Sequence, residues 1–115
     1  MYRLQYAEIL DDDQGDARER ERTAFSQSIA LMEIAVSNTA TPVDVANAIV
    51  FTTKLWTALI EDLADSGNGL PKVLRAQIIS IGIWVLRELD NIRNKKSASF
   101  EDVKAVSISI RDGLL

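Results

Sequence analysis

Apolar residues recur along this chain at intervals of three and four positions, the spacing of one face of an α-helix. Four such segments follow one another, without the strict alternation and hairpin turns of paired β-strands. We therefore expect an all-α fold, a small antiparallel bundle of about four helices with a short N-terminal arm. The predicted helices cover residues 16–38, 41–66, 71–95 and 99–113, and the arm with its turn covers residues 1–15.

Each predicted helix carries an apolar stripe that we expect to face the core. The stripes of the first two helices are Phe25, Ile29, Met32 and Val36, and then Ile49, Trp56, Leu59, Ile60 and Leu63. The stripes of the last two are Leu74, Ile78, Ile81, Val85, Leu86, Leu89 and Ile92, and then Val103, Val106, Ile110 and Leu114. Ile79, Ile83 and Trp84 fall outside the third stripe, so the third helix is apolar nearly all round. Such a helix is either central to a bundle or touches a partner.

Cap and turn residues mark where the helices begin and end. Thr41 is a good N-cap, and Pro42 and Asp44 suit the first turn that follows it. We expect the glycines of residues 66–69 to close the second helix in the left-handed conformation. Pro71 is expected at the first position of the third helix, where its missing N–H has no cost.

Two further positions carry local signals. Gly82 lies in the interior of the third helix, where glycine costs up to about 1 kcal/mol relative to alanine. A close crossing of two helices is the expected reason for accepting that cost. Ser99, with Asp102 three residues later, resembles a capping box at the start of the fourth helix.

Composition limits the chemistry that the chain can perform. Its 115 residues fit one domain, and a hydrophobic content of 47% is enough for a core. There is no cysteine and no histidine, which removes disulfides, thiolate metal sites and the commonest general base and metal ligand. We therefore expect no enzyme, no catalytic residues, no cofactor and no metal site.

Two acidic clusters do not change this interpretation. Residues 11–16 invite a calcium-loop interpretation, but the sixth and twelfth loop positions hold Asp16 and Arg22 instead of glycine and glutamate. The carboxylates of residues 61–65 could do acid–base work only in a shaped, partly dry cleft, which nothing in the sequence implies. Both clusters are predicted to be solvated.

Net charge and hydropathy bear on partners and location. The net charge of −4 argues against direct binding to nucleic acid. The only support for an RNA-associated role is an excess of basic over acidic residues in the C-terminal part of the chain. The basic residues concerned are Arg75, Arg87, Arg93, Lys95, Lys96 and Lys104. The first residues lack the features of a signal peptide, and the most apolar stretch, Ile78–Leu86, has half the length needed to span a bilayer. We expect a cytoplasmic protein that does not enter a membrane.

The residues proposed to contact a protein partner are Tyr2, Tyr6, Trp56, Ile79, Ile83, Trp84 and Arg87. Both tryptophans are first expected in the core, because indoles at helical spacing usually pack there. One of them could instead line a groove for a partner helix, and Trp84, outside the main stripe, is the better candidate. The sequence leaves open whether Tyr2 and Tyr6 fold back onto the bundle or dock on a partner.

Several runs of residues resemble the FlaF family of flagellar biosynthesis regulators from alphaproteobacteria. They are Leu55-Trp56-Thr57, Leu70-Pro71 with Leu74-Arg75, Ile79–Val85, Arg111-Asp112-Gly113 and, near the start, Tyr2 with Tyr6–Leu10. The likeness covers nearly the whole chain and is weakest from Ala17 to Asn47.

The resemblance implies a role in making flagellin. FlaF-like proteins promote flagellin synthesis and secretion, associate with flagellin and act alongside FlbT, which restrains flagellin translation through its message. The implied mechanism is chaperone-like, with a helical groove that shields the apolar helical ends of unassembled flagellin. Two alternatives stay open: an RNA-associated regulator of the flagellin message, and a homodimer whose apolar face pairs with itself. The sequence does not tell which helix faces the partner, which flagellin segment binds, or whether FlbT and flagellin compete.

Overall fold

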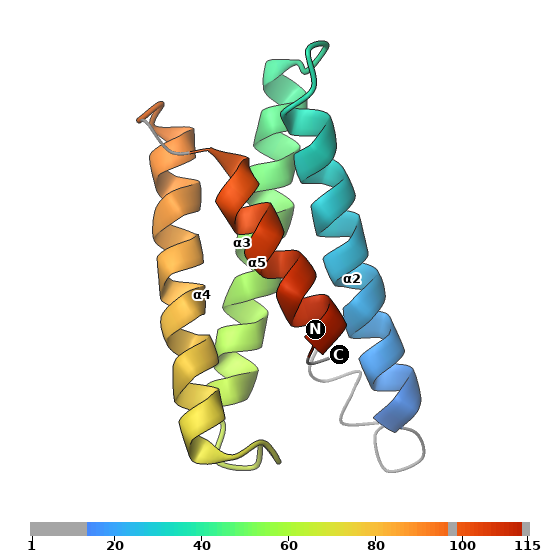
Figure 1. Cartoon of the computed structure of the whole chain (residues 1–115), viewed down its shortest axis with the longest axis vertical. Helices are drawn as coiled ribbons and strands as arrows, with labels where there is room; N and C mark the ends of the chain where they lie inside the picture. Colours follow the sequence, from blue (N-terminus) through green and yellow to red (C-terminus); the bar gives the residue numbers. More distant parts are fainter. Residues whose placement is uncertain (1–13, 97–98, 114–115) are drawn as a thin grey trace.

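A computed structural model describes residues 14–96 and 99–113 of the chain as four helices and their connections. The helices are α2 (Gln14–Ala35), α3 (Pro42–Ala64), α4 (Lys72–Arg93) and α5 (Phe100–Gly113). Successive helices run in opposite directions, and the short α5 crosses the bundle diagonally in front of α3 (Figure 1). The predicted all-α antiparallel bundle is confirmed. Residues 1–13 of the expected arm lie outside the described residues.

The helices form a ring in which α3 packs on both α2 and α4. The fourth helix, α5, packs mainly on α2 and only slightly on α4. The helix α5 is shorter than α4 and leans towards α2 (Figure 1). It therefore leaves part of α4 uncovered, although the sequence predicts that α4 is apolar nearly all round.

The start of α3 follows the prediction. The Thr41 hydroxyl accepts a hydrogen bond from the Asp44 backbone N–H at 3.2 Å, and the Asp44 carboxylate accepts one from the Thr41 N–H at 2.9 Å. With Pro42 in the first turn, this capping box fixes the first residue of the helix. At the start of α5, the Ser99 hydroxyl accepts from the Glu101 N–H at 3.1 Å.

The turn between α3 and α4 closes differently from the prediction. No glycine among the described residues has a positive φ, and Asp65 ends α3 in an extended conformation. The Asp65 carboxylate accepts from the Gly67 N–H at 2.9 Å, and Arg75 Nη1 donates to the Leu63 carbonyl at 3.0 Å. Side chains therefore supply hydrogen-bond partners for backbone groups at the end of α3. The expectation that a left-handed glycine closes this helix was wrong. Pro71 is the N-cap of α4 and not its first residue.

The end of α4 shows why this helix is shorter than expected. Lys95 adopts the left-handed conformation, with φ of 59°, at the position that glycine usually fills after a helix. Its N–H donates to the Ile92 carbonyl at 3.0 Å, and the Lys96 N–H donates to the Asn91 carbonyl at 2.9 Å. These two bonds close the last turn, so the helix ends at Arg93.

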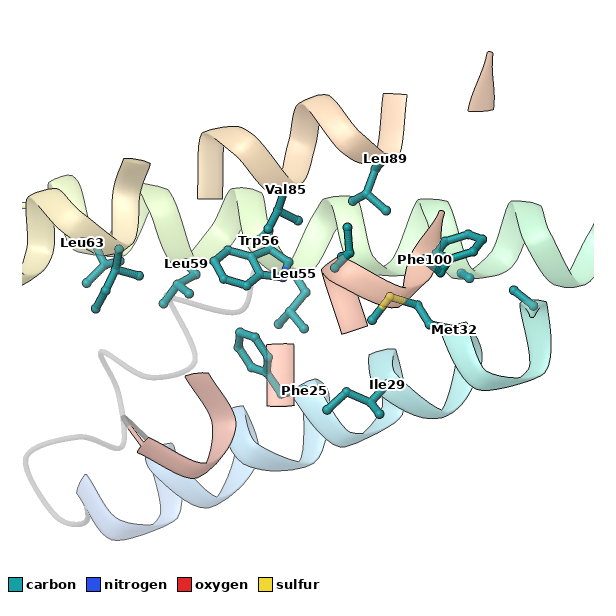
Figure 2. Packing of buried hydrophobic residues seen from close by; sticks show 14 residues of the cluster. Phe25, Ile29, Met32, Leu55, Trp56, Leu59, Leu63, Val85, Leu89 and Phe100 are labelled. Carbon is teal, nitrogen blue, oxygen red and sulfur yellow. The ribbon is translucent and has the colours of Figure 1, made fainter. Parts of the chain in front are cut away.

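All four helices contribute buried apolar side chains to the core (Figure 2). Trp56 is completely buried at its centre, as expected for a core tryptophan. The Phe25 ring of α2 meets the indole edge-on, with ring centroids 5.6 Å apart and planes at 77°. The indole Nε1 donates to the Ser107 hydroxyl of α5 at 3.3 Å, so the buried N–H is satisfied.

Some of the predicted core positions are wrong. Val36 is exposed because α2 already ends at Ala35, and Ile81 is exposed on α4, which α5 covers only slightly. In α5 the buried residues are Phe100, Val103 and Ser107. Val106 and Ile110 of the expected α5 stripe are half-buried, and Leu114 lies outside the described residues.

The contact between α2 and α3 contains polar groups that the stripes did not predict. The fully buried hydroxyls of Ser28 and Thr52 are 2.6 Å apart and bond to each other. Further along the same contact, burial and the negative charge of Asp62 raise the pKa of Glu21 to about 7, and Arg18 partly opposes this. The raised pKa of Glu21 thus results from the contact between two helices, and the local sequence does not predict it.

Gly82 lies at a close approach of α3 and α4. A Cβ atom at this position would lie 2.7 Å from both Cγ1 and Cδ1 of Ile60 and 3.2 Å from Cε3 of Trp56. The expectation that this glycine permits a close helix crossing is confirmed.

We expect Gly82→Ala to destabilise the protein by about 1–3 kcal/mol, because the clash outweighs the better helix propensity of alanine. Urea unfolding followed by circular dichroism measures this change. The matched control is Gly69→Ala, since a Cβ at Gly69 meets nothing within 4 Å. Adding Ile60→Val to Gly82→Ala should recover part of the loss. A Gly82→Ala protein as stable as the wild type would contradict the close crossing.

The raised pKa of Glu21 predicts a pH dependence of stability. Below about pH 4.5 the carboxyl is protonated in both folded and unfolded chains, and between about pH 4.5 and 7 only the unfolded chain ionises. The free energy of unfolding should therefore fall as the pH rises through this window. Glu21→Gln should remove that loss and stabilise the protein at about pH 8 by on the order of 1–2 kcal/mol, a value discounted for partial exposure.

The control for this prediction is Glu19→Gln, which removes one exposed negative charge from the same helix. Urea unfolding of both variants is measured at about pH 5 and about pH 8. The interpretation fails if the advantage of Glu21→Gln over Glu19→Gln does not grow between these two pH values.

Candidate partner-binding surface

The structure describes five of the seven residues proposed to contact a partner. Tyr2 and Tyr6 lie outside the described residues. Trp56 is completely buried, so it offers no surface to a partner in this fold, and its inclusion among the partner-facing residues is corrected to a packing role. The four remaining residues all belong to α4.

Three of the four α4 residues follow one line along the helix, and Trp84 lies about 100° around the helix from Ile83. Ile79, Ile83 and Arg87 follow one another at intervals of four residues, so they lie nearly in line along α4. Ile83 is 49% exposed, whereas Ile79 is half-buried against the core. Trp84 is also half-buried, and Arg87 is exposed. We call these four residues the outer stripe of α4.

The neighbouring helix α3 also keeps apolar side chains at the surface. Val43 is 65% exposed and Val50 is 52% exposed. Neither valine was a candidate from the sequence, although both lie off the stripe that contains Trp56 and Leu59. The two adjacent helices therefore present more apolar surface than α4 alone.

Among the described helices, α3 is long and apolar enough to cross a membrane, judged by length and composition only. This differs from the sequence-based view, in which Ile78–Leu86 was the most apolar stretch. It is weak evidence for a membrane helix, because a core helix passes the same test and α3 buries Trp56, Leu59 and Leu63 against its neighbours. Only 28% of its most apolar window is buried, which agrees with the exposed valines.

Acidic groups do not gather on the outer stripe. Within residues 14–96 and 99–113, no three acidic side chains come together in a way that could hold a metal ion. The Glu21 carboxyl, with its raised pKa, lies at the contact of α2 with α3, near Asp62. The stripe on α4 instead combines apolar side chains with one cation, Arg87, which suits contact with an amphipathic helix.

Comparison with known proteins identifies the family of the chain. A family model described as flagellar protein FlaF matches residues 2–114. No curated protein and no solved structure matched the chain. The matched region contains all four described helices and the outer stripe of α4. The chain therefore belongs to the FlaF family of flagellar proteins.

Proposed function

We propose that this chain is a cytoplasmic adaptor that binds flagellin in a chaperone-like way and thereby promotes flagellin synthesis and secretion, alongside FlbT. Membership of the FlaF family supports a flagellar role. The observation that carries the proposal of direct protein binding is the exposed Ile83 in the outer stripe of α4, with exposed Arg87 one turn further on and half-buried Ile79 and Trp84 beside it, because an apolar side chain open to solvent on a helix suits contact with a partner helix.

In the proposed mechanism, a contact with α4 stands in for the apolar contact that flagellin helices make with each other in the filament. The apolar helical ends of flagellin pair with each other in the filament, so before assembly they need cover. Ile79 and Ile83, one helical turn apart, can form a ridge that fits between the side chains of a bound helix. Arg87 continues the same line and can pair with an acidic group on that helix. A contact of this limited size favours reversible binding, as an export chaperone requires.

The alternative of direct contact with the flagellin message has less support. Several of the basic residues that could contact RNA already form hydrogen bonds or ion pairs within the chain. Arg75 donates to backbone carbonyls at the end of α3, Arg93 pairs with Asp90, and Lys104 lies 3.4 Å from Glu101. The net charge of −4 also disfavours a nucleic-acid partner. We propose no catalytic step, since the chain has neither histidine nor cysteine to supply the commonest reactive groups.

The proposal predicts that Ile83→Glu weakens flagellin binding by at least about tenfold, because a charge would be buried in an apolar contact. Isothermal titration calorimetry with purified flagellin measures the dissociation constant. The matched control is Ile34→Glu on α2, since Ile34 and Ile83 are both 49% exposed. We expect the control to bind within about twofold of the wild type.

Two results would contradict this proposal. One is the absence of heat and of co-elution when wild-type chain and flagellin are mixed at about 50 µM. The other is an equal loss of binding in both variants, which would mean that the outer stripe of α4 is not the contact surface.

A further inference from the structure

A side of α3 that α4 covers only in part carries a second regular pattern. Positions spaced alternately by three and four residues are uncharged, and they are Val43, Ala46, Val50, Thr53, Thr57, Ile60 and Ala64. This is the spacing of the a and d positions in a coiled coil. The valines and alanines of this set are exposed, and the other three residues are half-buried. Ile60 among them packs against Gly82 of α4, so the lower part of the set lies at the edge of the contact with α4. We call the set the α3 seam.

The charges of α3 are distributed in a way that points to a partner. Asp44 is held in the capping box, and Asp62 lies near Glu21 of α2. The remaining two charges, Lys54 and Glu61, are both exposed and lie seven residues apart, at the same heptad position beside the seam. Neither forms an ion pair within the described residues. The uncharged α3 seam is thus flanked by one cation, Lys54, and one anion, Glu61.

We propose that the α3 seam packs against the same seam of a second copy, with the two α3 helices antiparallel. In that arrangement a twofold axis passes close to Thr57, and Lys54 of each copy faces Glu61 of the other. A parallel pairing would place Lys54 against Lys54 and Glu61 against Glu61. The order of the two charges along the helix therefore selects a second copy in the antiparallel direction.

The composition of the seam sets the strength of this dimer. Alanine, valine and threonine allow two helices to approach closely but bury little apolar area, so the dimer should dissociate at tens to hundreds of micromolar, roughly. The inference concerns α3 and a copy of the same chain, whereas the proposed function concerns α4 and flagellin. Its test uses the chain alone, so either idea can fail without the other.

Charge reversal tests the dimer directly. Sedimentation equilibrium of the full chain from about 10 to about 500 µM should show self-association. Lys54→Glu and Glu61→Lys should each weaken it about tenfold, because each turns two attractive pairs into two repulsive ones. The double variant Lys54→Glu/Glu61→Lys should recover the wild-type dissociation constant to within about threefold. The control is Glu33→Lys at an exposed position on α2, with no expected effect.

A cross-linking experiment gives a second readout that does not depend on charge. The natural chain has no cysteine, so Thr57→Cys introduces a single thiol close to the proposed axis. Mild oxidation with oxidised glutathione should convert it to a disulfide-linked dimer much faster than Gln27→Cys, an exposed position on α2. A wild-type chain that stays monomeric over the whole range would overturn the proposal. So would a double variant that is no stronger than the single ones, or equal cross-linking at both positions.

Discussion

The fold depends on the indole of Trp56, which lies where all four described helices meet. From its place on α3, the indole meets the Phe25 ring of α2 edge-on and donates its N–H to the Ser107 hydroxyl of α5. It also lies so close to Gly82 of α4 that a Cβ atom there would be 3.2 Å from its Cε3. The close approach of α4 needs glycine at this point, and the buried N–H needs an acceptor from α5. Three different interactions thus fix the relative positions of the helices around one side chain.

This central arrangement also explains why apolar surface remains outside the core. One face of α3 is used up around Trp56, and the opposite face has no helix to cover it, so Val43 and Val50 stay exposed. On α4, Ile83 and Arg87 also stay exposed. The bundle is thus held together around Trp56 and still leaves apolar side chains of two adjacent helices at its surface. The proposed function of this member of the FlaF family uses one of these two helices, α4.

The sequence predicted those features that depend on a few neighbouring residues. The Thr41–Asp44 capping box and the close crossing at Gly82 were visible because caps and interior glycines have local causes. Exposure of Ile81 could not be predicted, since it results from the tilt of a short α5 towards α2. Likewise, the raised pKa of Glu21 needs Asp62 from another helix. For the candidate surface, periodicity separated Ile83 from the core but could not show that Trp56 is fully enclosed.

The central place of Trp56 is tested most directly in a Trp84→Phe protein, which keeps Trp56 as its one tryptophan. Because the Trp56 indole is completely buried, we expect blue-shifted emission that acrylamide hardly quenches in the native protein. We also expect fluorescence and far-ultraviolet circular dichroism to report the same urea midpoint, because the indole becomes exposed only when the whole bundle unfolds. Red-shifted, easily quenched native emission, or a fluorescence transition at lower urea than the loss of helix, would contradict the central place of this side chain.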